Sequence, residues 1–429
     1  MEVSSPSPRS RRPARFLAIF LLLALIALGT SAIAVHVWAE FHFRQAQNEL
    51  KKLQLTRARE HLEKCLKVWP RSFRVNFLAA RTARRLGDME QAEAYLQTCQ
   101  QLVGNRDEIV LERLLIRAQF DEPDEVQDAL RDLVQKNHPD SSLILEALAR
   151  GYALMFRFVD LDFILQMWRE RDPDNLLIDV FQAWSYEQLG AREDATKVFK
   201  RIIERDPHND EARFRLANLL IDLLKPAEAI PHLETIIRRH PDNLFAKVRL
   251  ALSLHDMGQL DEAEKILDEV LQQDPNYPPA LTARGRIALQ MNQVEEAVDY
   301  LRRSAEIDRI DYPTHFLLHQ ALLRLDRPEE LAEVSERLKL LESDTRRLHD
   351  VVVVQNSQNP NDPALCVEAG AILLRMGEKE DGLRWLQRAL KIDPLYARAH
   401  AELAKYFESH GDAKRATYHR RMAGEQVSR

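Results

Sequence analysis

The feature that most constrains the fold of this chain is a spacing of 34 residues that recurs along it. Four prolines keep this interval: Pro173, Pro207, Pro241 and Pro275. Four alanines keep it as well: Ala195, Ala229, Ala263 and Ala297. A fixed period of roughly 20 to 50 residues is typical of repeat architectures, in which each repeat packs mainly against its neighbours. The chain is therefore expected to be a stack of local cores instead of one large core.

One period, residues 210–243, has the pattern of two helices. Its first half carries apolar residues at the spacing of a helix face: Phe214, Leu216, Ala217, Leu219, Leu220 and Leu223. Its second half begins near Ala227 and ends at Pro241, because a proline ring cannot continue a helix. Glycines stand at the expected turns of other periods, where a positive φ costs them little: Gly190, Gly258 and Gly377. Each period therefore predicts a helix–turn–helix.

The order of small and apolar residues in these periods resembles that of the tetratricopeptide repeat family. With residue 210 as position 1, position 8 is small: Ala46, Ala80, Ala149, Ala183, Ala217, Ala251, Gly285, Gly370 and Ala404. Position 20 is also small: Ala58, Ala92, Ala195, Ala229, Ala263, Ala297, Gly382 and Ala416. Position 24 is apolar: Leu62, Leu96, Leu130, Leu165, Phe199, Leu233, Leu267, Leu301 and Leu386. The resemblance implies an all-α fold, a right-handed superhelical α-solenoid of about eleven repeats.

The pattern weakens in two places. The third repeat, residues 107–141, has Leu114 and Val126 where small residues are expected, and the ninth, from Tyr312, loses the pattern. The predicted organisation is a basic tail (1–15), one transmembrane helix (16–38), repeats one to nine (39–345), an irregular insertion with room for an extra helix (346–362), and repeats ten and eleven with a polar C-terminal cap (363–429).

The segment before the repeats is apolar. Residues 16–38 contain no acidic residue and no lysine or arginine, and about 20 apolar residues suffice to cross a bilayer. We expect an uncleaved anchor, because the apolar run continues past Ala34 and Trp38 suits the membrane interface. The alternative is a signal peptide cleaved after the Ala32–Ile33–Ala34 site, which would release the repeats.

Basic residues precede this segment closely: Arg9, Arg11, Arg12 and Arg15. Because such residues tend to stay in the cytoplasm and long domains cross largely regardless of charge, we expect a single-pass protein with its repeats outside the cytoplasm. A bacterial inner membrane protein facing the periplasm fits best. The alternatives are a soluble periplasmic carrier or assembly factor, released by cleavage, and a cytoplasm-facing import-type receptor.

Composition and motifs argue against other functions. The net charge is −6, with acidic and basic residues interspersed, which is typical of a solvated surface and does not predict nucleic-acid binding. The chain lacks the sequence motifs of phosphate loops, zinc proteases, redox cysteine pairs and serine hydrolases. Its three cysteines predict packed thiols. We therefore expect no enzyme, no cofactor and no metal.

The family resemblance implies a concave groove lined by the first helix of each repeat. Carried onto this chain, it assigns binding of a peptide or protein segment to Trp184, Phe214, Asn218, Phe245, Val248, Arg286 and Phe316. Aromatic residues at nominally exposed positions would be anchors, Asn218 would pair with a peptide backbone and Arg286 with an acidic group. In the alternative reading, the rings only pack between neighbouring first helices. The sequence pattern of the carboxylate clamp, which binds the tails of chaperones in some members of this family, is absent from this sequence.

The lipid bilayer is the second expected partner, through residues 16–38.

Overall fold

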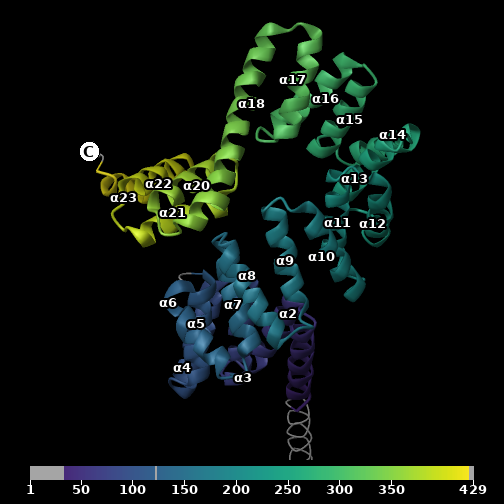
Figure 1. The fold of residues 1–429 in the computed structure, drawn as a ribbon. Helices are drawn as coiled ribbons and strands as arrows, with labels where there is room; N and C mark the ends of the chain where they lie inside the picture. The colour runs from purple at the N-terminus through teal and green to yellow at the C-terminus, as the bar shows by residue number, and fades with distance from the viewer. Residues whose placement is uncertain (1–32, 121–122, 425–429) are drawn as a thin grey trace, which may run out of the picture. The chain divides into compact units, whose positions relative to one another are not determined.

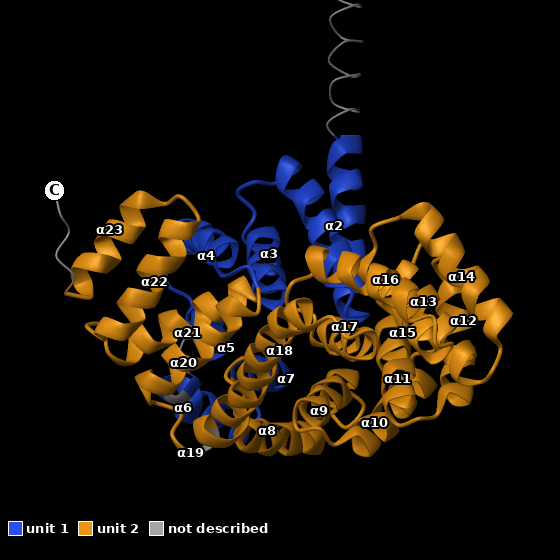
Figure 2. Ribbon diagram, turned by 90° about the horizontal axis from the view of Figure 1, so that it is seen from above, with its two compact units in different colours: residues 1–151 blue, residues 152–429 orange. Residues whose placement is uncertain are grey.

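The computed structural model describes residues 33–120 and 123–424. All regular structure in these residues is helical, and successive helices alternate in direction as helix–turn–helix pairs (Figure 1). The predicted all-α fold of stacked helix pairs is confirmed. The chain divides into two compact units, Met1–Gly151 and Tyr152–Arg429, which we describe separately (Figure 2).

Unit 1 begins, in its described part, with a helix over residues 33–51. The helices that follow are α2 (Leu55–Val68), α3 (Phe73–Leu86), α4 (Met89–Val103), α5 (Asp107–Phe120), α6 (Pro123–Gln135) and α7 (Ser141–Leu154), the last of which ends just past the unit boundary. The third repeat, despite its irregular sequence, forms the pair α5 and α6.

Unit 2 continues the alternation. Its helices are α8 (Phe158–Arg171), α9 (Leu176–Gln188), α10 (Arg192–Arg205), α11 (Asp210–Asp222), α12 (Pro226–Arg239), α13 (Leu244–Asp256), α14 (Leu260–Gln273), α15 (Pro278–Gln290), α16 (Val294–Ile307), α17 (Tyr312–Leu325), α18 (Pro328–His349), η1 (Asp350–Gln355), α19 (Asn356–Gln358), α20 (Pro363–Arg375), α21 (Lys379–Ile392), α22 (Ala397–Ser409) and α23 (Ala413–Met422).

The same local signals start successive first helices of unit 2. Asn175, Asn209 and Asn243, 34 residues apart, each accept a hydrogen bond on the side-chain oxygen from a backbone N–H of the helix that follows. Such N-caps satisfy one of the free donors at a helix start. The turn inside each pair needs a positive φ, which Gly190 (φ 70°) and Gly258 (φ 80°) supply. Local chemistry therefore repeats with the same period as the fold.

The small residues lie where the helices of a pair approach each other. Ala183, Ala217 and Ala251 at position 8 and their partners at position 20 are completely buried. A Cβ added at Gly370, at position 8, would lie 2.9 Å from the carbonyl oxygen of Gly382, at position 20, so α20 and α21 approach too closely there for a side chain. These positions are small for packing, as the sequence pattern predicts.

The predicted tail and most of the predicted transmembrane helix, residues 1–32, lie outside the described residues. Among residues 33–120 and 123–424, no helix combines the length and the apolar character needed to span a bilayer. The described part of the 16–38 segment is therefore only its last six residues.

The ninth repeat and the insertion form one long helical stretch. Helix α18 has 22 residues and runs directly into the π-helix η1 and then α19. Where small and apolar residues normally close a repeat, this one has Leu331 and Ser335, and a hollow of about 950 Å³ opens between α16, α17 and α18. The insertion 346–362 is thus mainly helix.

Candidate functional site

The residues predicted to line the groove lie on first helices of unit 2: Trp184 on α9, Phe214 and Asn218 on α11, Phe245 and Val248 on α13, Arg286 on α15, and Phe316 on α17. Unit 2 curves so that α9, α11, α15 and α17 lie toward the inside of the curve, while α10, α12 and α14 lie outside (Figure 2). We call the inside surface formed by α9, α11, α13, α15 and α17 the inner face.

A hollow of about 400 Å³ opens on the inner face between α13, α15 and α17. Arg286 and Phe316 both line it, although 30 positions separate them in the sequence. Leu289, Leu317 and Pro313 add apolar walls, and Gln320, Arg324 and Asp256 add polar ones. Small-molecule and peptide side-chain sites combine apolar walls with a few polar groups in this way.

Arg286 is the free cation of this hollow. It is half-buried, and it forms no ion pair with any of the residues that the structure describes. Arg324 Nη1 is already engaged, since it donates to the Leu289 carbonyl oxygen at 3.1 Å. A half-buried guanidinium without a carboxylate is an electrostatic cost that an acidic ligand would relieve.

A second arginine adds to the positive potential next to the hollow. Burial lowers the pKa of Arg249, the charge of Arg286 lowers it further, and Asp222 opposes the shift. Arg249 Nε donates to Asn218 Oδ1 at 2.8 Å. Asn218 therefore holds a neighbouring arginine, and its side-chain oxygen is not free to pair with a peptide backbone as expected.

All four aromatic residues of the predicted set contact other rings, Phe316 by stacking on Tyr312 with centroids 6.1 Å apart. Phe214 and Phe245 have centroids 5.5 Å apart at 60°, which joins α11 to α13. The ring centroid of Trp184 lies 5.9 Å from that of Phe158 and 5.7 Å from that of Phe156. These contacts fit the alternative reading, in which rings hold neighbouring helices together. Phe245 nevertheless stays 40% exposed, so it has a face left for a partner.

The structure places Val248 differently from the sequence prediction. It is only 2% exposed and belongs to a core cluster with Ala251, Leu252 and Leu267. Contrary to its predicted place in the groove, the side chain at position 5 of this repeat packs into that cluster and offers almost no surface to a partner. Phe316, at the same position of the ninth repeat, is 40% exposed.

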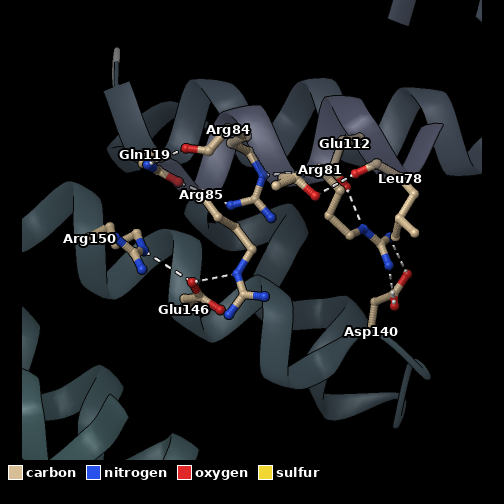
Figure 3. A network of polar contacts seen from close by, with 10 residues as sticks. Leu78, Arg81, Arg84, Arg85, Glu112, Gln119, Asp140, Glu146 and Arg150 are labelled. Carbon is tan, nitrogen blue, oxygen red and sulfur yellow. Dashed lines mark hydrogen bonds and ion pairs between the residues drawn. The ribbon is translucent and has the colours of Figure 1, made fainter. Parts of the chain in front are cut away.

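A polar cluster in unit 1 was missed by sequence reasoning. Figure 3 shows arginines of α3 meeting carboxylates of α5 and α7. Arg84 Nε donates to Glu112 Oε1 at 2.6 Å, and both side chains are completely buried. Arg81 bridges Glu112 and Asp140, and Arg85 with Arg150 holds Glu146. The interspersed charges of the sequence predict solvent-exposed side chains, and this prediction is wrong for the cluster.

The cluster joins neighbouring helices. The partners lie 28, 31, 59 and 61 residues apart, so they tie three successive first helices together. Burial raises the pKa of Glu112, but Arg84 and Arg81 outweigh it and hold that pKa below its ordinary value. Because Arg84 and Glu112 have no exposed surface, the cluster is structural. Within the described ranges, no group of three or more His, Cys, Asp or Glu could hold a metal.

Comparison with known families supports the repeats directly. Models of the tetratricopeptide repeat family match residues 43–102 and 182–243, residues 224–287, and residues 278–311. No curated protein matches the chain.

Some solved structures resemble the chain at low overall similarity. The type IV pilus biogenesis factor PilW is 20% identical, with a TM-score of 0.39, over 46% of this chain and 92% of PilW. The Cut9–Hcn1 assembly of APC/C is 16% identical, with a TM-score of 0.34, over 94% of this chain and 91% of that chain. MamA from MSR-1 is 22% identical, with a TM-score of 0.34, over 40% of this chain and 98% of MamA. At such low identities, nothing about partners is taken from these proteins.

Proposed function

We propose, on the premise that this chain belongs to the tetratricopeptide repeat family, that it is a membrane-tethered scaffold whose inner face in unit 2 binds a peptide or protein segment. Tetratricopeptide repeats generally bind protein partners, so membership of this family supports a protein-interaction scaffold. The observation that carries the finer proposal is the hollow between α13, α15 and α17, where the free cation Arg286 stands beside the half-exposed ring of Phe316.

The chemistry of this hollow favours a particular ligand. An apolar side chain would cover Phe316, Leu289 and Leu317, and a carboxylate one or two residues away would reach Arg286. Hydrogen bonds to a charged group contribute about 1.5–3 kcal/mol each when they form in a site of this kind. The expected ligand is therefore an extended segment with an acidic residue next to an apolar one.

Exposed apolar residues extend the surface beyond the hollow. Phe245 and Phe316 are each 40% exposed and Leu323 is 56% exposed, all on first helices. Apolar side chains gathered on one face of a protein commonly mark an interaction surface. The segment would then run from α17 towards α13, with Phe245 as a second anchor.

The proposed tether is supported by the first described residues. Ile33, Val35 and Val37 are 65%, 45% and 64% exposed, and Trp38 is 44% exposed. All side chains from residue 33 to 38 are exposed. His36 accepts a hydrogen bond from Trp69 Nε1 at 2.7 Å, while Ile33, Val35 and Val37 keep much of their apolar surface uncovered. A helix that is apolar all round is favoured inside a bilayer. Residues 16–38 are therefore proposed as an uncleaved anchor, in a bacterial inner membrane with the repeats on the periplasmic side.

The tether is tested by the fate of the amino terminus. Mass spectrometry of the native protein should find residues before Val35, and alkaline carbonate should leave the protein in the membrane. A mature chain that begins at Val35 would show instead a released periplasmic carrier or assembly factor. A reporter fused after Arg429 that works only in the cytoplasm would contradict the orientation and favour the import-type receptor.

The binding function is tested with defined peptides. The full chain in detergent is screened by fluorescence polarisation against peptides that carry one acidic residue beside leucine or phenylalanine, and against the same peptides with the acid replaced by its amide. Binders should lose about 10- to 100-fold in affinity with the amide, and equally with Arg286→Ala. The matched control is Arg192→Ala, an exposed arginine on α10, which should change nothing. Equal binding of acid and amide peptides would contradict the proposal.

A further inference from the structure

Two segments of unit 2 that lie about 200 residues apart in the sequence meet in the structure. Asn356, at the start of α19, donates from Nδ2 to the Met155 carbonyl oxygen at 2.8 Å. Phe156 stacks on Trp385 with centroids 6.2 Å apart at 28°. Phe156 also packs against the core cluster that contains Val351. The turn between α7 and α8 therefore touches both the insertion and the tenth repeat.

Phe156 has an unusual backbone conformation for a large residue. Its φ is 54°, at the repeat position where Gly190 and Gly258 have φ of 70° and 80°. A positive φ strains a residue with a Cβ, although Leu53 (φ 59°) also adopts it at the same repeat position. Contacts with Trp184, Phe158 and Trp385 surround this ring.

Leu224 provides the comparison within the same chain. It stands at the equivalent position two repeats later and has nearly the same φ, 58°. Its side chain is 89% exposed. A large residue at this position is thus compatible with the repeat fold when its side chain faces solvent, whereas the ring of Phe156 contacts Trp385.

The insertion supplies the other half of this contact. It falls outside the 34-residue period, so the stack of repeats does not need it. Its π-helix η1 places Val351 and Val352 in the core at 0% and 6% exposure, beside Trp385 at 4%. Single π-turns inside α-helices are often found at functional sites. What the insertion adds to the fold is a surface that receives the α7–α8 turn.

We propose that residues 350–358 are a latch, which holds the two ends of unit 2 together by gripping Met155 and Phe156. The closed latch fixes the curvature of the inner face and hence the spacing between Phe245, Arg286 and Phe316. Its importance for binding rests on the function proposed above, but its existence does not. The contact is small, and Asn356 Oδ1 is buried without a hydrogen-bond partner among the described residues. A latch of this size can open when a partner enters.

The latch is tested by hydrogen–deuterium exchange of the full chain in detergent, without any partner. Phe156→Gly relieves the backbone strain but removes the ring, so amides of residues 350–358 should exchange about tenfold faster although the substitution is some 200 residues away. Phe156→Asn is the second variant, since Asn292 shows that asparagine adopts this φ at the same repeat position. The matched control Leu224→Gly should leave exchange in residues 350–358 unchanged.

A distance measurement completes the test. Spin labels on Val159→Cys and Lys405→Cys, both strongly exposed, should give one narrow distance distribution that broadens with Phe156→Gly. Unchanged exchange in 350–358 and an unchanged distribution in both Phe156 variants would overturn the latch, whatever the peptide experiment shows. If acid and amide peptides bind equally well while exchange in residues 350–358 and the spin-label distances respond to the Phe156 variants as expected, only the proposed function is overturned.

Discussion

Arg84 of α3 and Glu112 of α5 form a completely buried ion pair, with Arg84 Nε 2.6 Å from Glu112 Oε1. The two residues belong to first helices of successive repeats. Glu112 accepts a second arginine, Arg81, on its other oxygen at 3.1 Å. This charged pair thus ties neighbouring repeats of unit 1 together.

The first prediction concerns this tie. Glu112→Gln removes the negative charge and leaves Arg84 buried without its counter-ion. Breaking a buried pair by removing one partner costs about 3–5 kcal/mol, so the urea midpoint of unit 1 should fall strongly. The control is Glu93→Gln, because the Glu93–Arg113 pair is about one-third exposed and such pairs contribute about 0–1 kcal/mol. Similar effects of both variants would contradict the assignment.

The second prediction is a dependence of unit 1 stability on acid pH. Burial raises the pKa of Glu146, but Arg85 and Arg150 outweigh burial and hold it below the ordinary value, as Arg84 and Arg81 do for Glu112. A carboxylate whose folded pKa is lowered contributes stability above its unfolded pKa, about 4.3, and loses it as pH falls through the folded value. Thermal melting should therefore drop below about pH 4.3, and by less in Glu112→Gln. A melting temperature that rises on acidification would contradict this.

The third prediction concerns a histidine pair in the last repeat. His400 Nδ1 lies 2.8 Å from His419 Nδ1, and His400 Nε2 lies 3.0 Å from the Pro394 carbonyl oxygen. His400 Nε2 thus donates to this carbonyl oxygen, and the two Nδ1 atoms share one hydrogen bond. Burial, then His400 and Arg415, lower the pKa of His419 below 6.5.

A histidine with a lowered folded pKa stabilises the fold above its unfolded pKa and stops doing so as pH falls through the folded value. Exchange of amides in α22 and α23, corrected for the intrinsic rate, should accelerate as the pH falls below about 6.5. His419→Gln cannot gain a proton, so this pH effect should shrink. The same acceleration in the variant would show that another group is responsible.

The fourth prediction compares two glycines at close helix approaches. A Cβ at Gly151 would meet the Ala118 carbonyl oxygen, which is backbone, whereas a Cβ at Gly285 would meet the Leu301 side chain. Overpacking costs about 1–3 kcal/mol, and a side chain can move aside more cheaply than a helix backbone. Gly151→Ala should therefore destabilise the protein more than Gly285→Ala. The reverse order, measured by urea unfolding, would be inconsistent with the structure.

The fold was largely predictable because the small and apolar residues within each repeat indicate how its two helices pack together. The buried alanines at positions 8 and 20, such as Ala217 and Ala229, recur with the period, and one pattern serves every helix pair. The side-chain partners between repeats were not predictable. Arg84 pairs with Glu112 and Asn218 with Arg249 through the stacking of neighbouring helices, and no spacing within one repeat indicates those contacts.

The candidate site was predictable in part for the same reason. Repeat numbering places Arg286 and Phe316 on first helices, and the structure brings them to one hollow. Repeat numbering does not show which first-helix positions neighbouring side chains cover, as they cover Val248. Nor does a periodic pattern describe what an insertion does, so the contact between Asn356 and Met155 had no signal in the sequence.

The fifth prediction addresses the central claim, that the inner face binds a partner segment. A photo-reactive amino acid placed at Gln320, which lines the hollow with Arg286, should crosslink a partner in the membranes of the native host. The same group at Glu234, exposed on the outer helix α12, is the control and should give no specific product.

Mass spectrometry of the crosslinked peptide identifies the sequence of the bound segment. The segment crosslinked from Gln320 should carry an acidic residue beside an apolar one, and the crosslink should disappear with Arg286→Ala. Crosslinking from Glu234 but not from Gln320, or crosslinking at Gln320 that is unaffected by Arg286→Ala, would contradict it.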